Sequence, residues 1–136
     1  MKLFADTGAW IALLVESDVN HTKARSAFSR FLAEHALVVT SNYVIDETVT
    51  WLRYQVSHKA TVAFRETLTE ARAAHGLHVE WMSERIEGEA WDVFLRYSDH
   101  ELSFTDCTSA VIARELGLVA WAYGSDLATL GFQLVG

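Results

Sequence analysis

The chain has 136 residues, a length typical of one globular domain, and we expect residues 1–136 to form a single domain around one core. Hydrophobic residues make up 51% of the sequence and charged residues 21%, which excludes a disordered or collagen-like protein. The formal net charge is −7, so overall basicity is excluded as the means of capturing a nucleic acid. Such acidity suits either a protein partner or carboxylates that bind a metal.

No apolar run is long enough for a secretory signal or a membrane span, so we expect a cytoplasmic protein with no membrane partner. Cys107 is the single cysteine and cannot form an internal disulfide. It has no clustered His and Cys partners of the kind that bind zinc. We therefore expect Cys107 to be a small buried side chain.

Short apolar runs bounded by turn-forming residues predict five strands, over residues 3–5, 37–40, 77–81, 118–122 and 132–135. Between the first three strands, helical periodicity predicts helices over residues 9–15, 21–34, 42–56 and 59–75, with Gly76 as a helix stop. A helical apolar face from Ile86 to Tyr97 comes next, then a loop over residues 98–103 and a helix that begins near Thr105. Strands joined by helices form parallel sheets, so we predict a three-layer α/β/α fold with a five-stranded parallel sheet.

Four acidic residues stand out against this layout as a candidate metal site. Asp6 directly follows the first predicted strand and Asp126 lies just beyond the fourth, so both are expected at the carboxyl edge of the sheet, where such folds bind ligands. Asp106 begins a helix, and Glu47 lies in an otherwise apolar helical stretch where an unpaired carboxylate is costly. Crowded carboxylates repel one another unless a cation neutralises them, and oxygen ligands favour Mg²⁺ or Mn²⁺ over zinc.

The same four residues also have a purely structural interpretation, which their spacing leaves open. Asp6 would cap the first helix, Asp106 and Asp126 would be carboxylates favoured at helix N-termini, and Glu47 would be solvated.

Two other catalytic classes fit poorly. Asp6-Thr7-Gly8 matches the aspartic-protease signature, but that chemistry needs a second aspartate in a β-rich fold. A phospho-accepting aspartate domain needs a lysine after a late strand, and the last lysine here is Lys59.

Several segments resemble PIN-domain ribonucleases, especially the VapC-type toxins of toxin–antitoxin modules. The segments are Phe4-Ala5-Asp6-Thr7-Gly8-Ala9-Trp10, Thr40-Ser41-Asn42-Tyr43-Val44-Ile45-Asp46-Glu47-Thr48, Ser103-Phe104-Thr105-Asp106-Cys107-Thr108-Ser109-Ala110 and the stretch around Asp126. The Ser-Phe-Thr-Asp-Cys run is the most specific of them, and the resemblance extends nearly from end to end. It implies a PIN-like α/β/α domain that hydrolyses RNA phosphodiester bonds with Mg²⁺ or Mn²⁺.

The resemblance also implies roles for individual residues. Asp6 and Asp106 would be the main metal ligands, Glu47 a ligand or a water-orienting base, and Asp126 would position a second ion or outer waters. Thr7 would hydrogen-bond a carboxylate or a water of the metal. The family often has a hydroxyl or amide residue two positions before the last acid, where this chain has Gly124 and a shortened final motif, so Ser125 is the candidate for the missing hydroxyl.

Partners follow from the resemblance as well: an RNA substrate, a second copy of the chain in a homodimer, and an antitoxin protein whose C-terminal segment lies across the acidic groove. Candidate RNA contacts lie on the paired third and fourth helices, where a solvated helix face is the alternative: Arg53, Lys59, Arg65 and Arg72. Bulky apolar residues of the same helices exceed what the pair needs to bury, so another chain is expected to cover some of them: Trp51, Tyr54, Val62 and Phe64.

The remaining aromatic and imidazole side chains have structural alternatives. The six histidines show no metal-ligand spacing, so we expect surface or capping roles. Trp10 and Trp51 lie near acidic positions and are candidates for contact with a nucleobase, with core or interface packing as the alternative. Two further functions stay open, an inactive RNA- or protein-binding module on the same fold and a housekeeping PIN nuclease without an antitoxin.

Overall fold

The computed structural model describes residues 1–136 and contains one sheet of five strands, all parallel. The strands are β1 (Lys2–Ala5), β2 (Leu37–Ser41), β3 (Leu77–Glu80), β4 (Val119–Trp121) and β5 (Leu134–Val135). Their order is β3-β2-β1-β4-β5, so the chain builds outward from β1 on one side and then on the other. The carboxyl ends of β1 and β4 adjoin where this direction reverses, with Ala5 paired to Trp121. Open α/β sheets bind ligands at such a point.

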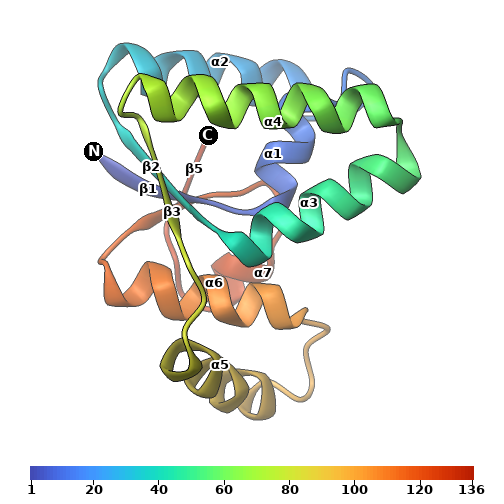
Figure 1. Ribbon diagram of the computed structural model, residues 1–136. Helices are drawn as coiled ribbons and strands as arrows, with labels where there is room; N and C mark the ends of the chain where they lie inside the picture. Colours follow the sequence, from blue (N-terminus) through green and yellow to red (C-terminus); the bar gives the residue numbers. More distant parts are fainter.

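Helices cover both faces of the sheet (Figure 1). One layer contains α1 (Thr7–Leu14), α2 (His21–Ala33), α3 (Asn42–Gln55) and α4 (His58–Ala73), and the other contains α5 (Glu84–Arg96), α6 (Phe104–Glu115) and the short α7 (Asp126–Thr129). The predicted three-layer α/β/α fold with a five-stranded parallel sheet is confirmed. None of the helices combines the length and the apolarity needed to cross a membrane.

All expected elements lie within two residues of their observed bounds, and the differences fall at their ends. β3 stops at Glu80, so Trp81 leaves the sheet and is exposed. β5 was expected to begin at Phe132, but the Phe132 N–H donates to the Leu127 carbonyl (3.0 Å) and closes the turn after α7 instead. The four-residue helix α7 begins at Asp126, as the structural interpretation of that residue implied.

Serine side chains begin four of the helices. The hydroxyl oxygens of Ser41, Ser57, Ser83 and Ser103 each accept a hydrogen bond from the backbone N–H three residues later, at the starts of α3, α4, α5 and α6. Such caps satisfy a donor that the first helical turn leaves free, and each contributes about 1 kcal/mol. Because α3 carries Glu47 and α6 carries Asp106, two of the caps also determine where these carboxylates lie.

Two histidines end helices in the left-handed backbone conformation. His35 follows α2 with a φ of 55°, and His75 follows α4 with a φ of 59°. In each case the next N–H donates to a carbonyl five residues earlier, Ala36 to Phe31 and Gly76 to Ala71, both at 2.9 Å. Gly76 was expected to stop α4, but the positive φ that does so belongs to His75.

An aromatic cluster fills the core beneath the α1 layer. The Trp10 ring lies 5.6 Å from those of both Phe64 and Trp121, and all three side chains are fully buried. Of the two interpretations of Trp10, core packing is therefore correct and contact with a nucleobase is not. Phe64 adds nothing to the apolar surface, and that expectation is corrected, because an apolar residue near the edge of a helical stripe can face inward or outward. Cys107 is buried, as expected.

A short chain of buried hydrogen bonds links this core to the end of β1. The Trp10 indole N–H donates to the Thr40 hydroxyl (3.3 Å), and that hydroxyl donates to the Ala5 carbonyl (3.1 Å). Buried polar groups that lack partners are costly, so the three groups hold one another in place. The backbone immediately before Asp6 is thereby fixed.

Candidate active site

Asp6 lies at the junction of β1 and α1, where it has two roles. It is the N-cap of α1, and its Oδ1 accepts a hydrogen bond from the Ala9 N–H at 2.9 Å. Its pKa is raised from 3.8 to about 7, chiefly by burial and also by the charges of Asp106, Glu47 and Asp126, while the Ala9 hydrogen bond lowers it. The capping interpretation is therefore correct, and it does not exclude the other one. The other three predicted acids all lie within electrostatic reach of Asp6.

Asp106 is held at the start of α6 by a reciprocal pair of hydrogen bonds. The Ser103 N–H donates to its Oδ2, and its own N–H donates to the Ser103 hydroxyl, both at 3.0 Å. The pKa of Asp106 is raised to about 6, chiefly by burial and also by the neighbouring Asp126 carboxyl, whereas the Ser103 hydrogen bonds lower it. Ser103 is a positioning residue that the sequence analysis did not single out, although the Ser-x-x-acid spacing of a capping box marks it.

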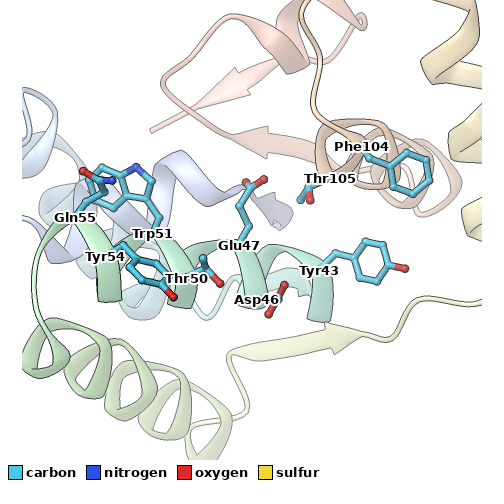
Figure 2. A pocket seen from close by; sticks show the side chains of 9 residues that line it. All are labelled: Tyr43, Asp46, Glu47, Thr50, Trp51, Tyr54, Gln55, Phe104 and Thr105. Carbon is cyan, nitrogen blue, oxygen red and sulfur yellow. The ribbon is translucent and has the colours of Figure 1, made fainter.

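Glu47 reaches the cluster from α3. Its side chain is half-buried, and it extends toward Thr105 at the start of α6, whereas its neighbour Asp46 points away (Figure 2). Asp126, the first residue of α7, is exposed. No Lys, Arg or His forms an ion pair with any of the four acids. Their negative charge therefore has no cationic partner within the chain.

The four carboxylates are gathered but not closed into a cage. No three His, Cys, Asp or Glu side chains are arranged so that they hold one ion, although the electrostatic coupling places all four near Asp6. Like charges repel one another, which opposes a tight cage when no cation is bound. A closed cage is also unnecessary for Mg²⁺, which commonly uses one or two carboxylates and keeps several waters.

The two supporting hydroxyls differ. The Thr7 Oγ1 is buried and makes no hydrogen bond to any protein group, including a carboxylate. Such an orphaned oxygen beside Asp6 is unusual, because buried hydroxyls nearly always have a partner. Ser125 is exposed, and its hydroxyl makes no capping hydrogen bond to α7.

A pocket of about 540 Å³ opens beside Glu47 (Figure 2). One wall is a face of α3, the other is the start of α6, and it is lined by Tyr43, Asp46, Glu47, Thr50, Trp51, Tyr54, Gln55, Phe104 and Thr105. Trp51 thus lies near an acidic site residue, as expected. The four cations predicted to contact RNA, Arg53, Lys59, Arg65 and Arg72, are exposed on α3 and α4, but none lines this pocket.

The sequence matches the family model of the PIN domain over residues 3–133. The chain belongs to the PIN-domain family. It is 32% identical over 131 residues to the 23S rRNA-specific endonuclease VapC20 of Mycobacterium tuberculosis, covering 96% of this chain and 95% of that protein. It is also 28% identical over 140 residues to a VapC ribonuclease of Archaeoglobus fulgidus, covering 96% of this chain and 83% of the relative.

Solved structures with the same fold agree with this assignment. The crystal structure of Mycobacterium tuberculosis VapC20, described as a Sarcin-Ricin loop cleaving toxin, superimposes with a TM-score of 0.82 at 32% identity and covers 96% of this chain and 95% of that one. FitAcB from Neisseria gonorrhoeae gives a TM-score of 0.67 at 12% identity, over 100% of this chain and 97% of that one. At that identity the likeness shows only the fold. The resemblance to VapC-type PIN ribonucleases is confirmed.

Proposed function

We propose that this chain is an endoribonuclease that hydrolyses RNA phosphodiester bonds in the cytoplasm as the toxin of a toxin–antitoxin pair, with residues 1–136 as one catalytic domain. The observation that carries the proposal is the gathering of Asp6, Glu47, Asp106 and Asp126 at the carboxyl edge of a PIN-domain sheet, without a balancing cation. Relatives that match nearly the whole chain are named as an endonuclease and a ribonuclease, which supports the same chemistry.

A divalent cation, Mg²⁺ or Mn²⁺, fits the site for two reasons. The pKa values of Asp6 and Asp106 are raised by burial and by neighbouring carboxylates, so their ionised forms are destabilised. A bound cation would stabilise these ionised forms. The unpartnered Thr7 hydroxyl supplies one more oxygen beside Asp6. When bound, such an ion stabilises charge on the phosphoryl oxygens and makes water a better nucleophile at neutral pH.

The chain's own contacts prepare the acids for this role. Backbone N–H groups hold one oxygen of each main ligand, Oδ1 of Asp6 and Oδ2 of Asp106. Glu47, on the opposite wall, would be a ligand or the base that orients the attacking water. Asp126 would position a second ion or outer waters, with the Thr7 and Ser125 hydroxyls as hydrogen-bonding supports.

RNA contacts are proposed on the same helical layer. Arg53, Lys59, Arg65 and Arg72 are exposed and form no ion pair. Trp51 lines the pocket beside Glu47, where its ring is available to a nucleobase.

Protein partners are proposed from the apolar surface and from the acids. Tyr54 is 80% exposed and Val62 41%, and together with Trp51 they are candidates for contact with a second copy of the chain. An inhibitory antitoxin would reach the carboxylate groove with Arg or Lys, because a guanidinium fork matches carboxylate geometry.

The test is RNA cleavage by the purified protein. Wild-type protein should cut RNA, EDTA should stop it, and added Mg²⁺ or Mn²⁺ should restore it. Co-expression with the small open reading frame beside its gene should give an inactive complex. Cleavage that resists chelation would contradict the metal, RNA binding without cleavage would leave a binding module, and cleavage with no inhibitory neighbour would leave a housekeeping PIN nuclease.

A further inference from the structure

Of the seven helices, only α2 carries basic residues without any acidic one. Its 13 residues include Lys23, Arg25 and Arg30 and no Asp or Glu, although the whole chain has a net charge of −7. A charge of +3 on a single helix is therefore a local reversal of the protein's sign. Clustered cations of this kind are the electrostatic feature by which proteins contact nucleic-acid backbones.

These three cations are free to meet an external anion. Their side chains are exposed, and none forms an ion pair within the chain. Arg85 on α5 shows the contrast, because it pairs with both Glu89 (3.2 Å) and Glu115 (2.9 Å). The α2 cations are not used for folding in that way.

A shallow hollow on α2 adds neutral hydrogen-bond donors to the charges. It has a volume of about 280 Å³, and its lining is entirely polar and free of carboxylates: His21, Thr22, Arg25, Ser26 and Ser29. Hydroxyl and guanidinium groups are the donors that proteins commonly direct at phosphate oxygens. The absence of an apolar anchor makes the hollow a poor seat for a protein segment, because protein interfaces concentrate their binding energy in buried apolar and aromatic residues.

Tyr123 connects this surface to the acidic cluster. Lys23 lies over the Tyr123 ring, with Nζ 6.0 Å from the centroid, and Tyr123 precedes Asp126 by three residues in the loop after β4. Burial is the main cause that raises the pKa of Tyr123, the hydrogen bond from Trp121 and the charge of Arg30 lower it, and the charges of Asp18 and Asp6 raise it. The Tyr123 hydroxyl is thus within electrostatic reach of both the α2 cations and the candidate active site.

We propose that α2 binds the sugar-phosphate backbone of RNA and leads the strand past Tyr123 to the acidic cluster. Arg25 and the hydroxyls of the hollow would hold one phosphate, and Lys23 and Arg30 would contact its neighbours. The proposal rests on the proposed ribonuclease function and explains how a chain of net charge −7 holds a polyanion. It also adds contacts beyond those proposed on α3 and α4.

The test is the salt dependence of RNA binding, measured by fluorescence anisotropy with a single-stranded RNA in EDTA. Neutralising the surface with Lys23→Gln, Arg25→Gln and Arg30→Gln should reduce the slope of log affinity against log salt by about 2, because each single-strand phosphate contact contributes about 0.7. Affinity at 0.1 M salt should fall about 10- to 100-fold. The charge-preserving triple Lys23→Arg, Arg25→Lys and Arg30→Lys should keep the wild-type slope.

A control removes three positive charges elsewhere: Lys2→Gln, Arg85→Gln and Arg96→Gln, all exposed in the fold, with circular dichroism to check that loss of the Arg85 ion pairs leaves the protein folded. It should leave the slope nearly unchanged. An unchanged slope in the α2 triple would overturn the proposal, and so would an equal fall in the control, because net charge would then explain the effect. A Glu-rich peptide that competes with RNA for α2 with equal affinity would also overturn it.

Cleavage kinetics separate this proposal from the ribonuclease assignment. At saturating RNA the α2 triple should cut at the wild-type rate, while the RNA concentration for half-maximal rate should rise about tenfold or more. Wild-type protein that binds RNA through α2 but never cuts it would refute the ribonuclease and leave the α2 surface standing. If the α2 triple cuts RNA with an unchanged half-maximal RNA concentration, the α2 surface is refuted and the ribonuclease assignment stands.

Discussion

Ser103 and Asp106 hold each other at the start of α6, each accepting a hydrogen bond at 3.0 Å from the other's backbone N–H. The Ser103 hydroxyl caps the helix, and the Asp106 carboxylate is fixed through one oxygen. The capping box of α6 thus orients a proposed metal ligand. Asp6 is oriented in the same manner, because it caps α1 through the Ala9 N–H.

Replacing Ser103 by Ala tests this dual role. The loss of the cap should lower the free energy of unfolding by about 1 kcal/mol, and the less firmly held Asp106 should reduce RNA cleavage about tenfold or more. Urea unfolding and initial cleavage rates measure the two effects. Ser57→Ala is the matched control, because it removes the same kind of cap from α4, which carries none of the four acids. Equal losses of activity in both variants would show that Ser103 matters only for stability.

Without divalent metal, folding stability should depend on pH through Asp6. Its carboxyl has a pKa of about 7 in the folded chain against 3.8 ordinarily, so the folded state binds the proton more tightly. The stability from this protonation is fully present below pH 3.8 and is lost as pH rises toward 7, at most about 4 kcal/mol in all. In EDTA, wild-type protein should therefore resist urea better at pH 5 than at pH 8.

Asp6→Asn is the matching variant, since asparagine keeps the acceptor for the α1 cap and removes the charge. It should flatten the pH dependence and stabilise the protein at pH 8 in EDTA. Added Mn²⁺ should stabilise the wild type at pH 8 more than the variant. Identical pH profiles for the two proteins would reject the raised pKa of Asp6.

Neutralising Arg53, Lys59, Arg65 and Arg72 together with Gln should weaken RNA binding and flatten its salt dependence, because each lost phosphate contact lowers the slope by about 0.7. Anisotropy titrations at several salt concentrations give the slope. If the salt dependence of RNA binding in this variant equals that of the wild type, these four residues do not contact RNA.

The proposed homodimer is tested by placing charge on its apolar surface. Tyr54→Glu with Val62→Glu should convert the protein to a monomer, since both side chains are exposed and charge is costly in a buried interface. Light scattering at micromolar concentration gives the mass. Val19→Glu is the control, because Val19 is 95% exposed in the loop between α1 and α2, and this variant should stay dimeric. A wild-type monomer would contradict the dimer itself.

Much of this architecture could be predicted from local patterns. Short apolar runs separated by helical periodicity give parallel strands, and parallel strands bring Asp6 and Asp126 to one edge. Glu47 could be singled out because an unpaired carboxylate in an apolar helical stretch is energetically costly, which indicates a partner such as a cation.

Other features depend on tertiary packing, which local patterns do not contain. Phe64 and Tyr54 look alike in sequence, yet one is fully buried and the other is 80% exposed, because the packing of the helices against the sheet decides which face is covered. The left-handed His75 was missed because adjacent Gly76 is the commoner residue for that conformation. The α2 surface was missed because its significance comes from its place beside Tyr123.

The measurement that tests the central claim most directly is the rate of RNA cleavage by Asp106→Asn, with Mg²⁺ present and folding checked by circular dichroism. Asparagine keeps the size of the side chain and an oxygen that accepts the Ser103 N–H, but it removes the charge that would hold the cation. Our account predicts that the variant stays folded and that cleavage falls by orders of magnitude, with the same result for Asp6→Asn. Cleavage by both variants at the wild-type rate would contradict the assignment of this acidic cluster as the active site.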